Sequence, residues 1–157
     1  MADGEARRAR TFESGEGPYG QVIIAGRHVL SADEPVAVGG LDTGPDPYEL
    51  LLSALGACTA MTVRMYAERH GFPLKAVRVA LSHRQRVGGD GRLVDRFERE
   101  ILLEGVLSAE ERSRLIDIAG RCPVSQTLAR GSEVTAIEAL VPGHEDAPAS
   151  DAGASAA

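Results

Sequence analysis

The chain has 157 residues, 43% of them hydrophobic, which is enough to bury one core without support from disulfides or a structural metal. Its 23 acidic residues outnumber the 17 basic ones, the net charge is -6, and Lys75 is the one lysine, so a nucleic-acid backbone is excluded as the expected partner. We therefore expect one domain whose partner is a small molecule or another protein.

The two ends of the sequence are poor in apolar side chains. Residues 1–16 are rich in Arg, Glu and Ala, and residues 143–157 are small and polar, so we expect flexible tails around a folded domain over 17–142. The first residues show no apolar run of the kind that forms a secretory signal. The longest uncharged run, residues 50–63, is shorter than the roughly 20 residues that span a bilayer. We expect a soluble, cytoplasmic protein with no membrane partner and with reduced cysteines.

Short strands are predicted near the start of the domain. The stretch QVIIAGRHVL, residues 21–30, predicts two strands around Ala25 and Gly26, and PVAVGG, residues 35–40, predicts a third. Between them, the carboxylates of Asp33 and Glu34 precede a proline and are typical of a solvated turn.

The most regular apolar spacing lies between Pro45 and His70 and predicts a long helix. Asp46 suits the N-cap, Pro47 suits the first helical position, and Gly71 suits the end. The stretch LLLSALGAC is apolar nearly all round, which predicts a central helix buried on most of its circumference.

A long antiparallel hairpin is predicted after this helix. Residues 76–87 alternate between apolar and polar side chains, GGDG at 88–91 supplies a turn, and a second strand runs from about 93 to 104.

Two further helices and a strand are predicted beyond the hairpin. Ser108 and Glu111 have the spacing of a capping box, and Pro123 suits the first position of a helix that begins at CPVSQTLA. The stretch VTAIEALV, residues 134–141, predicts a last strand. Because strands and helices do not alternate as parallel crossovers require, we expect an α+β fold with a mainly antiparallel sheet.

The two cysteines occupy different predicted environments. Cys58 lies on an apolar helix, which by itself favours a small core residue over a nucleophile. Cys122 follows Arg121 and precedes a predicted helix, where the helix dipole and a guanidinium favour the thiolate, although such cysteines can be purely structural. Two cysteines and four scattered histidines lack the paired spacing of a zinc site, so we expect no metal and no cofactor.

Two segments, DTGPDPYELLLSALGACTAMTVRMYAERHG and GRCPVSQTL, resemble the signature of the OsmC/Ohr family of thiol-dependent peroxidases. The resemblance covers nearly all of residues 21–141 and implies an intertwined homodimer with two active sites at the subunit interface. It implies that Cys58 attacks an organic hydroperoxide and that Cys122 resolves the sulfenic acid into a disulfide. A small dithiol or a lipoylated protein would be the reductant.

The family also uses an arginine and a glutamate that hold the first cysteine as thiolate. In its better-known members the glutamate directly follows the proline of the motif, but Tyr48 stands there in this chain and Glu49 comes one residue later, about 100° further round the helix. Arg27 is the best-placed arginine. The resemblance thus predicts a peroxidase site of Cys58, Cys122, Glu49 and Arg27 for oxidative-stress defence. The displaced glutamate keeps open a second hypothesis, a ligand-binding or redox-sensing protein without enzymatic activity.

Overall fold

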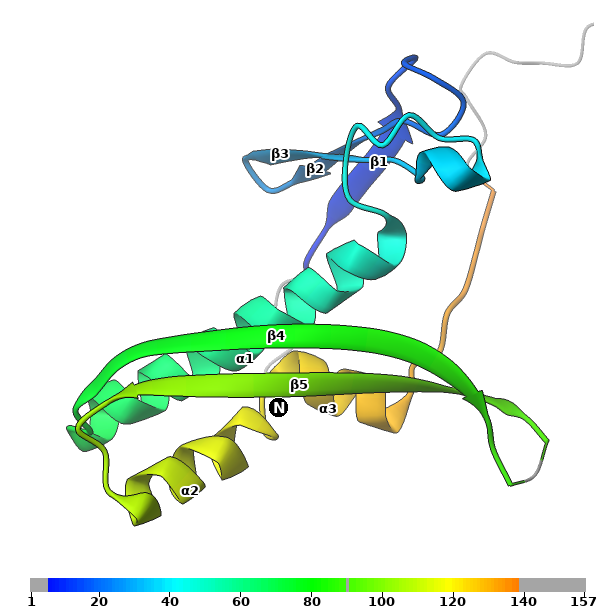
Figure 1. Ribbon diagram of the computed structural model, residues 1–157. Coiled ribbons are helices and arrows are strands. Elements are labelled where there is room, and N and C mark those ends of the chain that lie inside the picture. Colours follow the sequence, from blue (N-terminus) through cyan, green and yellow to red (C-terminus); the bar gives the residue numbers. More distant parts are fainter. Residues whose placement is uncertain (1–5, 90, 139–157) are drawn as a thin grey trace, which may run out of the picture.

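The structure, a computed structural model, describes residues 6–89 and 91–138. Figure 1 shows a small sheet that stands apart from a long β-hairpin, with a long helix leading from one to the other. The small sheet has the strand order β1-β2-β3 and the hairpin consists of β4 and β5, all pairs being antiparallel. The predicted α+β fold with antiparallel sheets is therefore confirmed. The strands are β1 (Ala9–Glu13), β2 (Gln21–Ala25), β3 (His28–Ala32), β4 (Leu74–Val87) and β5 (Leu93–Gly105).

The small sheet contains the two strands predicted around Ala25 and Gly26, and Gly26 makes the turn between them with φ 62°. The third strand, β1, pairs with β2 from Ala9 opposite Ala25 to Glu13 opposite Gln21. This strand lies in the segment expected to be a flexible tail. All five of its residues are exposed, so the strand is held by backbone hydrogen bonds to β2 and not by burial of its side chains. For this reason its amino-acid composition does not indicate a strand.

The loop after β3 differs from the prediction. Val36–Val38 form a 3-10 helix, η1, where a strand was expected. Asp33 does not lie in a solvated turn, because it is 3% exposed and its carboxylate accepts three backbone N–H bonds, from Glu34 (2.8 Å), Leu41 (3.0 Å) and Thr43 (3.2 Å). The Thr43 hydroxyl donates a fourth hydrogen bond to it. These bonds fold the loop back on Asp33, so it cannot extend into a strand.

The long helix is α1 (Pro47–His70), with the predicted boundaries. Asp46 caps its start, where the side chain accepts the Glu49 N–H (2.8 Å) and the Asp46 N–H donates to Glu49 Oε2 (3.0 Å), which completes a capping box. Gly71, at φ 68°, closes the other end in the left-handed conformation that glycine adopts without strain.

One face of α1 is buried, and the opposite face is open. A Cβ on Gly56 would lie 2.8 Å from Leu81 Cδ1, so the glycine lets β4 approach the helix closely. On the open side Met61 is 64% exposed and Met65 is 60% exposed. The expectation that α1 is buried on most of its circumference is wrong for the described chain, because β4 and the two later helices cover only one side. By length and composition alone α1 could also cross a membrane, a test that core helices of soluble proteins pass as well.

The hairpin and the two later helices form as predicted. α2 (Ala109–Ala119) begins after a capping box of Ser108 and Glu111, and α3 (Pro123–Arg130) begins after Cys122. Figure 1 shows the helices gathered beside the hairpin. The main core lies between them and consists of Val63, Ala67, Leu74, Leu103, Leu115 and Ala119.

The last predicted strand is not present in the described part of the chain. Residues 132–138 have no regular structure, and residues 139–141 lie outside the described residues. Val134 is 90% exposed and Ile137 is 94% exposed, because the segment leaves α3 without pairing with either sheet. Figure 1 shows it running from α3 toward the small sheet.

Candidate active site

The fold brings the two cysteines together. Cys58 lies in the middle of α1 and Cys122 directly precedes α3, which packs against α1. Both are free thiols, and the Cys58 side chain is near enough to lower the pKa of Cys122. Thr59, the next residue after Cys58 on α1, has its Oγ1 3.6 Å from Cys122 Sγ. Cys58 is half-buried, whereas Cys122 is 0% exposed. A reagent from solvent therefore reaches Cys58 first, and an oxidised Cys58 has a thiol partner beside it.

Cys122 is the N-cap of α3, as its place before Pro123 predicted. Its backbone is extended (φ -62°, ψ 142°) and its sulfur accepts the Ser125 N–H at 3.4 Å. The free N–H groups at a helix start favour a negative charge, so this position stabilises the thiolate.

A threonine and an arginine complete the surroundings of Cys122. Thr59 is 0% exposed, and its Oγ1 lies 3.6 Å from Cys122 Sγ. Arg99 Nη1 donates to Thr59 Oγ1 (3.0 Å) and to the carbonyl oxygen of Ala119 (2.9 Å). Arg99 is thus the guanidinium whose charge acts on Cys122.

Sequence reasoning missed Arg99, although the sequence contains a signal for it. Phe97, Arg99, Ile101 and Leu103 alternate along β5 and share one face, and Leu103 belongs to the core. An arginine in an otherwise apolar inward-facing row needs a polar partner inside the protein.

The environment of Cys122 changes its acidity in two opposing ways. Burial raises the pKa of the thiol. Hydrogen bonds from Thr59, the Ser125 N–H and Cys58, together with the charge of Arg99, lower it by more, so the pKa of Cys122 lies below the ordinary value of a cysteine. A larger fraction of this buried thiol is therefore ionised at neutral pH.

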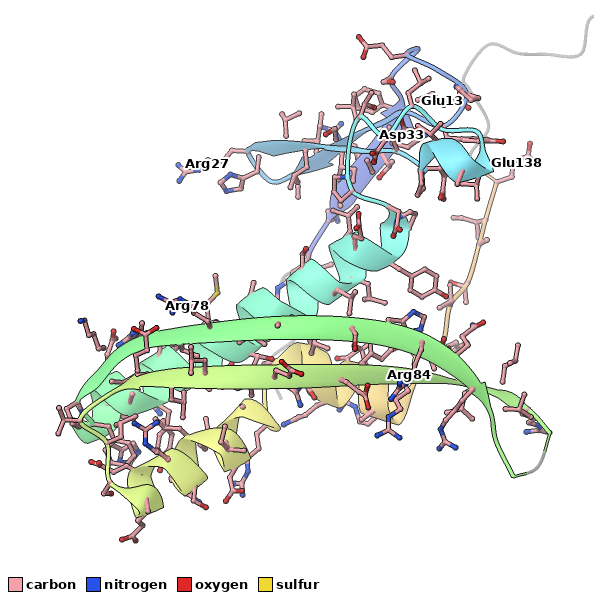
Figure 2. All side chains as sticks on the ribbon, in the orientation of Figure 1. Glu13, Arg27, Asp33, Arg78, Arg84 and Glu138 are labelled. Carbon is pink, nitrogen blue, oxygen red and sulfur yellow. The ribbon has the colours of Figure 1, made fainter. Side chains whose placement is uncertain are left out.

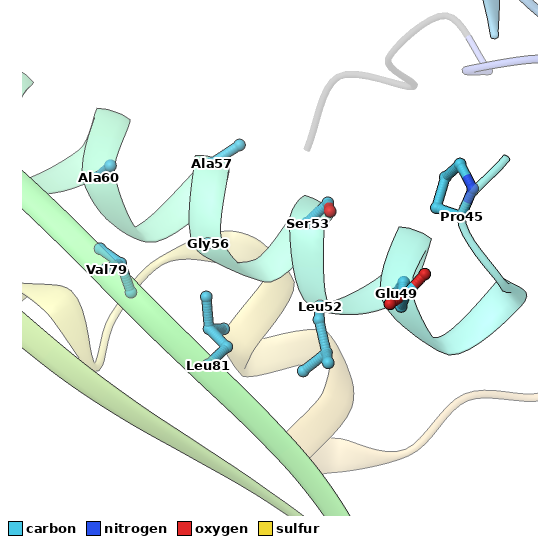
Figure 3. A pocket seen from close by; sticks show the side chains of 9 residues that line it. All are labelled: Pro45, Glu49, Leu52, Ser53, Gly56, Ala57, Ala60, Val79 and Leu81. Atoms are coloured by element: carbon cyan, nitrogen blue, oxygen red, sulfur yellow. The ribbon is translucent and has the colours of Figure 1, made fainter.

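Glu49 and Arg27 do not contact the thiols in the described chain. The Glu49 carboxylate caps α1, and nine residues of helix, a rise of about 13.5 Å, separate it from Cys58. Figure 3 shows Glu49 near Pro45 at the start of the helix. Arg27 is exposed in the turn between β2 and β3, and Figure 2 shows it pointing outward from the tip of that hairpin.

Tyr48, which follows Pro47 where the resemblance leads us to expect a glutamate, packs on the hairpin. Its ring stacks on His83 with centroids 4.5 Å apart and planes within 8°. His83 Nε2 lies 2.8 Å from Asp95 Oδ1, and the His83 side chain is 12% exposed.

Several hollows border α1, and two of them bear on the location of the site. One, of about 620 Å³, lies between α1 and β4 (Figure 3), and none of the groups that contact Cys122 lines it. The other, of about 440 Å³, is formed by α1, β5 and α3 and includes Arg99 and Ser125, so it is the one beside the thiol site. Its apolar lining consists of Tyr48, Leu51, Leu55, Phe97, Leu128 and Ala129.

The thiol site is the reactive cluster that geometry supports. Across residues 6–89 and 91–138, no group of three or more His, Cys, Asp and Glu side chains is placed to hold a metal ion. The arrangement favours an ionised thiol at Cys122, and it places a second free cysteine, Cys58, near enough to lower the pKa of that thiol. Two such cysteines are the partners that disulfide formation requires.

Comparison with known proteins agrees with this fold. The family model described as OsmC-like protein matches residues 40–136, well over half of the chain. No curated protein matches the sequence.

Solved structures share the fold at low identity. An OsmC-like protein from Mycoplasma pneumoniae is 19% identical, with a TM-score of 0.67 over 80% of this chain and 89% of its own. Two organic hydroperoxide resistance proteins are also similar. The one from Legionella pneumophila is 18% identical, with a TM-score of 0.60, and the match covers 79% of this chain and 89% of its own. The one from Elizabethkingia anophelis is 19% identical, with a TM-score of 0.61, and the match covers 80% of this chain and 89% of its own. The chain belongs to the OsmC-like protein family.

Proposed function

We propose that the protein is a thiol-dependent peroxidase that reduces organic hydroperoxides, with Cys58 as nucleophile and Cys122 as resolving cysteine. The observation that carries the proposal is that α3 packs on α1 and so brings two free cysteines to one site, where Thr59 Oγ1, next to Cys58 in the chain, lies 3.6 Å from Cys122 Sγ. The buried cysteine, Cys122, has a lowered pKa. Two structures with the same fold are described as organic hydroperoxide resistance proteins, which supports the substrate class.

The chemistry follows from the different accessibility of the two sulfurs. Cys58, the half-buried one, attacks the outer oxygen of the hydroperoxide as its thiolate. An S–O bond forms, the O–O bond breaks, and the leaving alkoxide takes a proton to become an alcohol. The Cys122 thiolate then attacks the Cys58 sulfenic acid, so that an S–S bond forms and hydroxide leaves as water. A dithiol reduces the disulfide by two exchange steps.

The hollow beside the site suits an apolar substrate. It has about 440 Å³, and most of its lining is aromatic or aliphatic, while Asp95, Arg99 and Ser125 are its polar side chains. An alkyl or aryl group of a hydroperoxide would bury apolar surface there, at about 25 cal/mol per Å². We accordingly expect bulky organic hydroperoxides to be preferred over hydrogen peroxide.

We further propose a homodimer. The open face of α1 carries Leu50, Ala54, Ala57, Met61 and Met65, an apolar row next to the separately standing β1–β3 sheet. A second subunit would cover this row, and Arg27 would approach a thiol pair only from the other subunit. Within this proposal the protein is soluble and cytoplasmic.

The decisive experiment is mass spectrometry after one equivalent of cumene hydroperoxide, followed by dihydrolipoamide. The wild type should lose two hydrogens and regain them with the dithiol. Cys58→Ser should stay unchanged, and Cys122→Ser should gain one oxygen that dimedone traps. Wild-type protein that keeps two free thiols after treatment refutes the peroxidase.

One observation favours a second function, a redox sensor on the same fold. In the described chain Glu49 caps α1 and does not approach Cys58, so the charge network expected from the family is incomplete. A sensor forms the disulfide once and waits for a reductase, whereas an enzyme consumes many equivalents of peroxide with dihydrolipoamide. Steady-state turnover distinguishes the two.

A further inference from the structure

The Thr59 hydroxyl lies between a guanidinium and a buried sulfur. Its oxygen is 3.0 Å from Arg99 Nη1, 3.6 Å from Cys122 Sγ and 2.8 Å from the Leu55 carbonyl oxygen. We propose that Arg99 is a positioning residue for Cys122, because it holds the Thr59 hydroxyl in place to donate its hydrogen to the sulfur during disulfide formation. Its role in that step rests on the proposed function, whereas its effect on the resting thiol does not.

A count of hydrogens supports this role. A hydroxyl has one hydrogen and two acceptor lone pairs. One lone pair accepts Arg99, and the hydrogen goes to Leu55 O while the neutral Cys122 thiol donates to the second lone pair. When Cys122 loses its proton, the hydroxyl hydrogen turns from Leu55 O to the sulfur. Leu55 O keeps the helical N–H bond from Thr59, so the rotation leaves no carbonyl without a partner.

Arg99 also fixes the approach to Cys122 from the other side. The same Nη1 donates to Ala119 O, in the last residue of α2, three positions before Cys122. One guanidinium therefore connects β5, α1 and the segment that leads to the sulfur. Among residues 6–89 and 91–138, the titratable or charged groups that act on Cys122 are Cys58 from α1 and Arg99 from β5.

The consequence concerns the second step of the reaction. Attack on the Cys58 sulfenic acid needs Cys122 as thiolate, because the thiolate is the nucleophile in exchange. Loss of Arg99 should therefore slow disulfide formation by a larger factor than it slows the first attack by Cys58.

The test titrates Cys122 by its ultraviolet thiolate absorbance in the full chain, on a Cys58→Ser background so that one thiol is observed. Arg99→Gln should raise the titration midpoint by about one pH unit, the low end of the effect of a nearby opposite charge. Thr59→Val should raise the midpoint too. Thr59→Ser keeps the hydroxyl and Arg99→Lys keeps the positive charge, so both should leave the midpoint close to that of the Cys58→Ser parent. Arg96→Gln, on the outward face of the same strand, is the matched control and should change nothing.

In the two-cysteine protein, stopped-flow measurement after one equivalent of cumene hydroperoxide should show disulfide formation slowed about tenfold near neutral pH by Arg99→Gln. If Arg99→Gln does not fold by circular dichroism, Thr59→Val decides alone. An unchanged midpoint in Thr59→Val or in folded Arg99→Gln overturns the inference. A wild type that consumes no peroxide while the midpoints shift as expected refutes the proposed function and leaves the role of Arg99 at the resting thiol standing.

Discussion

Glu49 has two possible roles, and substitution to glutamine and alanine separates them. In the structure its Oε2 accepts the Asp46 N–H at 3.0 Å, which makes it the reciprocal half of the α1 capping box. The family resemblance instead predicts a charge that helps to ionise Cys58. Glutamine keeps the acceptor oxygen and removes the charge, whereas alanine removes both.

The expected magnitudes follow from an exposed helix start. Glu49→Gln loses only the favourable interaction of a carboxylate with the helix dipole, about 0.3–1 kcal/mol. Glu49→Ala also loses one capping hydrogen bond and should cost about 1–2 kcal/mol in the free energy of unfolding. In a chain of this size 1 kcal/mol shifts Tm by about 2–4 °C, so the alanine variant should melt about 2–8 °C lower.

The chain offers a matched control in the second capping box. The Ser108 N–H donates to Glu111 Oε2 at 2.7 Å, at the start of α2. If capping is the role of Glu49, Glu49→Gln and Glu111→Gln should show the same small change in Tm and the same peroxide turnover by the dihydrolipoamide assay. A tenfold or larger loss of turnover in Glu49→Gln alone, with unchanged Tm, would refute the capping assignment and restore the charge to the active site.

Three further predictions concern the fold and assembly. Leu115→Ala removes a core side chain that is 0% exposed, and it should lower the free energy of unfolding, measured in urea, by about 2–5 kcal/mol. Ile116→Ala, at a position that is 47% exposed, should lower it by less than about 1 kcal/mol. Equal losses in the two variants would contradict the assigned core. Burial raises the pKa of Asp33 but its hydrogen bonds lower it by more, so the stability it contributes is present above the ordinary value of 3.8 and is lost as pH falls through the lowered pKa. Thermal melts should therefore show that Asp33→Asn has a lower Tm than the wild type at neutral pH and loses less of its Tm in acid. If the Tm of the two proteins falls in parallel with pH, the assigned role of Asp33 is wrong. Met61→Arg places a charge on the open apolar face of α1 and should shift a dimer toward monomer in light scattering, whereas a wild type that is monomeric at all concentrations contradicts the proposed dimer.

The features that depend on neighbouring residues could be predicted from the sequence. Asp46 and Gly71 bound α1, Ser108 and Glu111 begin α2, and Pro123 places Cys122 at the N-cap of α3. Each is a contact within about five positions of the chain, so the local residue types are sufficient to predict it. The motif around Cys58 could be recognised for a similar reason, because its residues are consecutive in the chain.

The features that depend on residues far apart in the chain became visible only in the folded structure. Packing of α3 on α1 brings Cys58 to Cys122, and β5 inserts Arg99 beside Thr59. Thr43 and Asp33 meet across a loop in which residues 35–40 were predicted to form a strand. Such contacts join residues far apart in the chain, and their free energy comes from burial and hydrogen bonds that exist only after the elements pack. For this reason Cys58 and Cys122 could be named from the sequence, whereas Arg99 was identified as the cation that acts on Cys122 only in the folded structure.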